Sequence, residues 1–134
     1  MKTLKRLSIT TNSKTEFINT TSRVEKEVRE SRVKEGICYL YVPHTTAGIT
    51  INEGADPDVG KDILNQLNNI VPSHGNYSHR EGNSPAHIKS SLIGCSETLL
   101  IHNNQLILGT WQSIYFCEFD GPRDRELIIK IEQI

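Results

Sequence analysis

The sequence predicts a small α+β domain, in which a mainly antiparallel, jelly-roll-like β-sandwich carries two main helices. Three observations favour this fold class. Several short segments alternate apolar and polar residues, as half-buried strands do. Two longer stretches have the composition or spacing of helices that pack on a sheet. The 134 residues show no βαβ rhythm, repeat or linker, so residues 1–134 are expected to form a single domain.

The first third of the chain predicts a strand, a helix and a second strand. Residues 4–11 alternate as a half-buried strand does. Ser22 and Glu25 match a capping box, in which both side chains satisfy free backbone N–H groups at a helix start. The segment that follows is rich in helix formers and is expected to end at Gly36. Residues 37–42 are a β-rich run.

The middle of the chain predicts a short strand at residues 49–51, then a helix, a loop and a shorter helix. Asp56-Pro57 is a strong helix start, because aspartate caps and proline suits the first turn. Apolar residues then recur at helical spacing as far as Ile70. Residues 73–85 hold two glycines, two asparagines, two histidines and no aliphatic residue; loops of this length tend to be functional. Residues 84–93 form the shorter helix.

The last third predicts antiparallel strands. Residues 97–101 and 105–108 flank Asn103-Asn104, a plausible tight hairpin turn. Residues 110–119 alternate as a strand, and residues 127–131 form the final one.

Charge and cysteine content limit the possible classes of function. Lys and Arg number 15 against 16 Asp and Glu, for a formal charge of -1. This balance argues against a nucleic-acid or membrane-surface partner. No apolar run approaches a membrane span, and residues 1–10 lack the apolar stretch of a signal peptide, so a cytoplasmic location is expected. Cys38, Cys95 and Cys117 are expected to be buried, reduced thiols.

Histidines are concentrated in one part of the chain. Four of the five, His44, His74, His79 and His87, lie between positions 44 and 87. They form no HxH or HExxH signature, but side chains from separate segments can converge on a divalent transition metal. Solvated loop histidines are an equally good interpretation of the spacing alone.

Four other groups are candidates for chemistry. Glu53 lies at a strand-to-helix junction, where a carboxylate can hold Mg²⁺ or act as an acid or base, whereas Asp56 is better explained as a helix cap. Lys89, with neighbouring hydroxyls and a helix start, suits a phosphate. The pattern favours a core position for Trp111 over a wall for an aromatic ligand. Arg123 suits a phosphate or carboxylate clamp, or an ordinary surface ion pair.

Taken in order, these segments resemble the YjbQ family. The resemblance covers residues 36–124, and its motifs are specific in combination although each is short. The matching segments are His44-Thr45-Thr46-Ala47, Asn52-Glu53, Asp56-Pro57, His79, His87-Ile88-Lys89-Ser90-Ser91 and Gly109-Thr110-Trp111-Gln112.

The resemblance implies a sandwich-like α+β protein that assembles as a homotrimer. It also implies a secondary thiamin-phosphate-synthase activity, a transferase reaction that couples hydroxymethylpyrimidine diphosphate to a thiazole phosphate and releases pyrophosphate. The expected partner is thus a small phosphorylated ligand. A divalent metal ion, Mg or Zn, is a possible cofactor, and no organic cofactor is expected.

The residues present suit that chemistry as a hypothesis. A leaving pyrophosphate needs charge neutralisation, and an aromatic ring can stack on a pyrimidine or thiazole. The alternatives are a metal-dependent hydrolase and a binding module for a phosphorylated small molecule. The expected catalytic residues are His44, Glu53, His79 and His87, with His44, His79 and His87 also as metal ligands; the expected substrate-binding residues are Thr45, Asn52, Lys89, Ser91, Trp111, Gln112 and Arg123.

Overall fold

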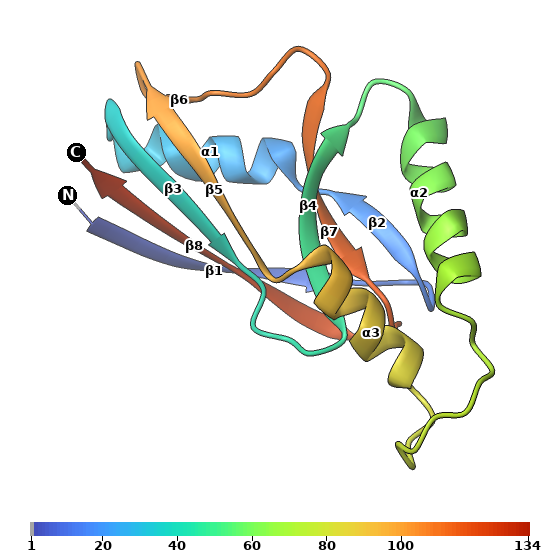
Figure 1. The fold of residues 1–134 in the computed structure, drawn as a ribbon. Helices are drawn as coiled ribbons and strands as arrows, with labels where there is room; N and C mark the ends of the chain where they lie inside the picture. The colour runs from blue at the N-terminus through green and yellow to red at the C-terminus, as the bar shows by residue number, and fades with distance from the viewer. Residues whose placement is uncertain (1) are drawn as a thin grey trace.

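The computed structural model describes the backbone of residues 2–134 and the side chains of residues 4–134 (Figure 1). Met1, the first residue of the predicted domain, lies outside the described residues. The elements are β1 (Lys2–Thr10), β2 (Glu16–Asn19), α1 (Thr21–Ser31), β3 (Glu35–Tyr41), β4 (Ala47–Glu53), α2 (Pro57–Ile70), α3 (Ser84–Ile93), β5 (Ser96–His102), β6 (Gln105–Leu106), β7 (Gln112–Glu118) and β8 (Asp124–Gln133).

The strands form two sheets. One has the order β1-β8-β3-β5-β6 and the other β2-β7-β4, and the paired strands are antiparallel. The predicted α+β class with mainly antiparallel sheets is therefore confirmed. Residues 2–134 contain three helices, and the jelly-roll arrangement is not confirmed.

Strand β7 lies at the centre of the core because both of its faces are covered. Ile114 and Phe116 belong to the main apolar cluster, which includes the buried side of α1 and the inner face of the larger sheet. Tyr115 and Cys117 point the other way, into a second cluster with Leu67 of α2. This double burial explains why residues 114–117 of β7 form an unbroken apolar run.

Helix α1 has different boundaries from those predicted. It starts at Thr21, whose N–H and hydroxyl donate to Asn19 Oδ1 at 3.0 and 2.7 Å, and no side-chain capping bond forms at its N-cap. The capping box at Ser22 is therefore wrong. The helix ends at Arg32, in the left-handed region with φ 60°, so the predicted end at Gly36 is also wrong. Gly36 lies in β3, where an added Cβ would overlap the Glu132 carbonyl oxygen.

Helices α2 and α3 agree with the prediction. Asp56 caps α2, and its Oδ1 accepts the Asp58 N–H at 2.9 Å. Helix α3 docks directly on the start of β4: Ser90 Oγ donates to the Ala47 carbonyl oxygen at 2.7 Å. The two backbones approach so closely that a Cβ at Gly48 would lie 2.7 Å from the Gly94 carbonyl oxygen.

The segments that connect these elements include the predicted turn and the predicted loop. Asn103 and Asn104, with φ 53° and 59°, form the predicted hairpin turn between β5 and β6. The irregular segment 71–83 joins α2 to α3 and projects from the body (Figure 1). Cys95 is exposed, contrary to the prediction, whereas the other two cysteines are buried.

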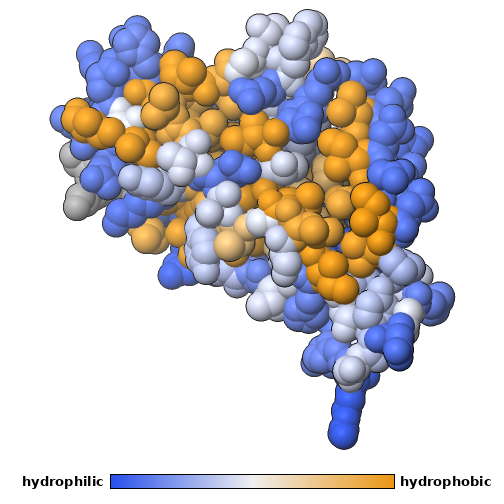
Figure 2. Space-filling view, in the orientation of Figure 1, coloured by the Kyte–Doolittle hydropathy of each residue, from blue (hydrophilic) through white to orange (hydrophobic). Residues whose placement is uncertain are grey.

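The surface around this projecting segment has an apolar part and a hydrophilic part. Figure 2 shows apolar side chains gathered over α3, where Ile88 and Leu92 are exposed, and hydrophilic ones on the projecting segment. None of the helices in residues 2–134 is long and apolar enough to cross a membrane.

Candidate functional site

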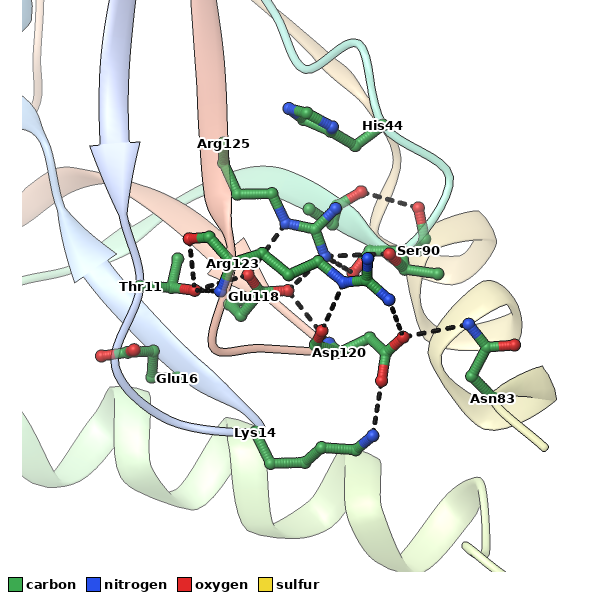
Figure 3. A network of polar contacts seen from close by, with 12 residues as sticks. Thr11, Lys14, Glu16, His44, Asn83, Ser90, Glu118, Asp120, Arg123 and Arg125 are labelled. Carbon is green, nitrogen blue, oxygen red and sulfur yellow. Dashed lines mark hydrogen bonds and ion pairs between the residues drawn. The ribbon is translucent and has the colours of Figure 1, made fainter. Parts of the chain in front are cut away.

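A buried ion pair joins the two sheets beneath the histidine-rich region. Glu118, at the end of β7, is fully buried and pairs with Arg125, near the start of β8. Arg125 Nε donates to Glu118 Oε1 at 2.8 Å, and Nη2 donates to Glu118 Oε2 (Figure 3). Nη2 also donates to Thr46 Oγ1 at 2.9 Å. Burial alone would raise the pKa of Glu118, but hydrogen bonds from Arg125, from the Asp120 N–H and from Thr11 outweigh it and keep this pKa below its ordinary value.

Asp120 is the second carboxylate of the polar network, after Glu118. Its Oδ1 accepts from Lys14 Nζ, and its Oδ2 accepts from Asn83 Nδ2 and from Arg123 Nη2, both at 2.9 Å (Figure 3). Burial opposes ionisation, but these donors hold the pKa of Asp120 well below its usual range. The carboxylate therefore orients three side chains that come from separate segments of the chain.

Two pockets border this network, and Asn83 lines both of them. The first, here called the histidine pocket, has a volume of about 440 Å³. Its lining residues are Pro43, His44, Thr45, Thr46, His79, Glu81, Asn83, His87, Arg123 and Arg125. The structure thus brings five of the predicted residues together: His44, Thr45, His79, His87 and Arg123.

The second pocket, here called the lysine pocket, has a volume of about 380 Å³. It includes Lys89, which the sequence analysis grouped with His87. The two residues are two positions apart on α3, so they cannot share a face of the helix. Ser91 lines neither pocket; its hydroxyl donates to the His87 carbonyl oxygen. The lining residues are Lys14, Thr15, Asn68, Val71, Ser73, Gly82, Asn83, Pro85, Ala86, Lys89, Phe119 and Asp120.

The remaining predicted residues lie at the opposite end of the smaller sheet. Ala47 pairs with Glu118 beside the histidine pocket, whereas Glu53 pairs with Gln112 six residues further along β4. At about 3.3 Å per residue, the separation along the strand is about 20 Å. Asn52 is the neighbour of Glu53, and Trp111 precedes Gln112. Trp111 is 64% exposed, so its predicted core position is wrong.

The guanidinium groups keep donors available for a ligand. Arg125 forms its hydrogen bonds through Nε and Nη2, and Arg123 likewise through Nε and Nη2. Among the hydrogen bonds of residues 4–134, none uses Nη1 of either arginine. Both carboxylate partners fix the orientation of these forks, so the histidine pocket is preorganised to accept an anion such as a phosphate group.

Comparison with known proteins adds the family. Residues 5–133 match the family model described as "UPF0047 protein YjbQ-like". This chain belongs to the YjbQ/UPF0047 family. It is 53% identical over 131 residues to the UPF0047 protein MJ1081 of Methanocaldococcus jannaschii, covering 98% of this chain and 95% of that protein. It is 51% identical over 129 residues to YugU of Bacillus subtilis, covering 96% and 98%.

Solved structures of YjbQ/UPF0047 proteins have the same fold. A Clostridium acetobutylicum family member has a TM-score of 0.94 at 54% identity, with 96% of this chain and 99% of that chain covered. A Sulfolobus solfataricus protein, described as YbjQ-like and of unknown function, has a TM-score of 0.96 at 28% identity, with 100% and 99% covered.

The donor set of this YjbQ-family pocket does not fit the predicted three-histidine metal centre. His44 Nε2 accepts the Glu126 N–H at 2.9 Å, so the neutral ring carries its proton on Nδ1 and has no lone pair left for a metal. Burial, with the nearby Arg125, lowers the pKa of His44 and favours this neutral form. His79 and His87 meet edge to face, with ring centroids 5.4 Å apart. Within residues 4–134, no three His, Cys, Asp or Glu side chains form a metal-binding group.

Sequence reasoning missed the residues that hold the site in shape. Glu118 was detectable as a charge at the end of the apolar run 114–117, since burial of such a residue requires a partner, whereas Arg125 lies among the other charged residues of β8 and does not stand out. Asn83 and Lys14 carried no comparable signal, because each acts through Asp120, which is distant in the sequence.

Proposed function

We propose that the histidine pocket binds the diphosphate of a small molecule and that this chain has thiamin-phosphate-synthase activity. The observation that carries the proposal is that Arg123 and Arg125, each with an Nη1 group that no hydrogen bond of residues 4–134 uses, line the same pocket as His44, His79 and His87. Guanidinium and imidazole N–H donors that are fixed before binding stabilise negative charge that develops on a leaving group.

The proposed reaction needs charge stabilisation more than proton transfer. The bond between the pyrimidine methylene carbon and the diphosphate oxygen breaks, and its electron pair leaves with pyrophosphate. The thiazole nitrogen uses its lone pair to form the new C–N bond, and it becomes a positively charged ring nitrogen. Neither substrate loses a proton, so no general base is required. His44 would act as an N–H donor from Nδ1, because its Nε2 is already occupied.

The residues at the far end of β4 and β7 enter the proposal only through a second copy of the chain. Glu53 and Trp111 lie about 20 Å along the sheet from the histidine pocket of their own chain, which is too far to touch one small substrate there. We therefore propose a homotrimer, in which this end of one copy completes the pocket of another. Mixing two inactive variants, Arg123→Met and Trp111→Ala, should then restore part of the activity.

The direct test is product analysis with the purified full-length chain. The protein is incubated with hydroxymethylpyrimidine diphosphate and thiazole phosphate, and thiamin phosphate and pyrophosphate are quantified, with Mg²⁺ and with EDTA in parallel. Arg123→Met should lower kcat/KM about 100-fold, as expected for loss of a charged donor to the leaving group. Arg23→Met, an exposed arginine on α1, is the matched control and should leave it unchanged.

Two results would contradict the proposal. The first is release of pyrophosphate with formation of the pyrimidine alcohol instead of thiamin phosphate, which would identify water as the nucleophile and the protein as a hydrolase. The second is binding of the diphosphate without turnover, which would identify a binding module.

A further inference from the structure

Lys89 is buried without a counter-charge. The residue is only 6% exposed, and its ammonium donates to the neutral Asn68 Oδ1. No carboxylate within residues 4–134 forms an ion pair with it. Lysine is rarely buried unless paired, because moving a bare ammonium out of water costs free energy that only an anion or several acceptors can offset. An ammonium has three donors, so Lys89 retains capacity for an anion.

A second cation shares the lysine pocket. Lys14 and Lys89 both line this pocket, and burial, together with the charge of Lys14, lowers the pKa of Lys89. Asp120 also lines this pocket, but Lys14, Asn83 and Arg123 already donate to it. A single carboxylate therefore serves three donors, and none of them is Lys89.

Asn83, which lines both pockets, has an unsatisfied acceptor. Its Nδ2 donates to Asp120 Oδ2 at 2.9 Å, which fixes the orientation of the amide because a carboxylate only accepts. Its Oδ1 is buried, and no donor in the described part of the chain reaches it. Such a buried acceptor is costly to leave unpaired, so it calls for an N–H or O–H group from a ligand or from water.

The rest of the lining sets the size and character of an occupant. Val71, Pro85, Ala86 and Phe119 provide an apolar surface between the polar groups. A volume of about 380 Å³ lies within the range of small-molecule sites and excludes a macromolecular partner from the cavity itself.

We infer that the lysine pocket is a second ligand site, separate from the histidine pocket, and that it binds a small organic anion. Lys89 receives the anionic group, either a phosphomonoester or a carboxylate, and Asn83 Oδ1 accepts a hydrogen bond from an amine or hydroxyl on the same molecule. This inference goes beyond the proposed function and does not depend on it, since Lys89, which receives the anionic group, lines the lysine pocket and not the histidine pocket.

The test is an NMR titration of the ¹⁵N-labelled full-length chain with three probes. Phosphoethanolamine carries a phosphate and an amine, β-alanine carries a carboxylate and an amine, and ethyl phosphate lacks the second donor. The Val71 and Ala86 amides report the lysine pocket, and the Thr45 amide reports the histidine pocket. Saturable shifts at Val71 and Ala86 are expected with phosphoethanolamine or β-alanine, and whichever binds more tightly identifies the anion. Ethyl phosphate should bind more weakly than phosphoethanolamine.

Two lysine variants make the test specific. Lys89→Met should weaken binding at Val71 and Ala86 about tenfold or more, the scale of one hydrogen bond to a charged group, while shifts at Thr45 persist. Lys34→Met, at an exposed lysine outside both pockets, should change nothing. If Lys89→Met does not fold, Lys89→Gln serves instead.

The inference is overturned if no probe gives saturable shifts at Val71 and Ala86, or if both Lys89 and Lys34 variants bind like the parent chain. Failure of the proposed synthase reaction is a different result, because it appears in the product assay and leaves these shifts unaltered.

Discussion

Replacing Arg125 with methionine should destabilise the fold, because it leaves the Glu118 carboxylate buried without its cation. The parent side chain bonds both carboxylate oxygens and also Thr46. In the variant, Glu118 keeps only the Thr11 hydroxyl at 2.7 Å and the Asp120 N–H at 3.0 Å. Breaking a buried ion pair by removing one partner typically costs 3–5 kcal/mol, and these two remaining donors favour the lower end, about 3 kcal/mol.

This free energy converts to a measurable shift in Tm. Unfolding entropy of about 2.1 cal/mol/K per residue gives about 0.28 kcal/mol/K for the 134 residues. A loss of about 3 kcal/mol therefore lowers Tm by about 11 °C. Differential scanning calorimetry at pH 7 is the assay. The loss should shrink toward pH 4, because without Arg125 burial raises the pKa of Glu118 and the carboxyl takes up a proton instead of remaining an unpaired charge.

The double variant Arg125→Met/Glu118→Gln tests whether the unpaired Glu118 charge causes the loss of stability. Glu118→Gln should destabilise the parent chain but should restore stability in the Arg125→Met background, because a neutral amide needs no cation. Two results would contradict this role of Arg125 as the cation that stabilises buried Glu118. One is a change in Tm of less than about 3 °C in Arg125→Met, and the other is a further loss of stability when Glu118→Gln is added to that variant.

Three further predictions concern other parts of the fold. Asp56→Ala should cost about 1 kcal/mol in denaturant unfolding, because the α2 cap is lost, whereas the exposed Asp58→Ala should cost less. Gly36→Ala should give little folded protein by circular dichroism, since its Cβ would overlap a backbone oxygen; normal folding would contradict the packing of β3 on β8. Asp120 and Glu118 have pKa values below those of the unfolded chain, so the stability they contribute is present above about pH 4 and is lost as pH falls through their folded pKa values. Asp120→Asn should flatten this acid limb, and an unchanged limb would contradict the assignment.

Local signals predicted well wherever the physical cause is itself local. Asp56-Pro57 starts α2 because the cap and the first turn are neighbours in sequence. Asn103-Asn104 makes the hairpin because both residues adopt positive φ readily. The loop rich in glycine, asparagine and histidine was also well placed, and the structure brings its His79 beside His44 and His87.

Predictions failed where a distant segment decides the outcome. Gly36 reads as a helix end, but its lack of a side chain is required by β8, almost a hundred residues later. Lys89 and His87 read as one phosphate cradle, but the helix directs them into different pockets. Trp111 reads as core because large apolar residues usually are, but it lies before β7 begins, where neither sheet covers it.

The close contact between Gly48 and Gly94 fixes the position of α3, and α3 carries residues that line both pockets. His87 lines one cavity and Lys89 the other, and the backbone at the C-terminal end of the helix that carries them, at Gly94, packs directly against Gly48 of β4. A methyl group at Gly48 would lift the helix and displace both side chains together. A substitution that touches neither ligand would then weaken two separate binding events at once, so correlated losses of affinity in this protein need not mean that the two sites communicate.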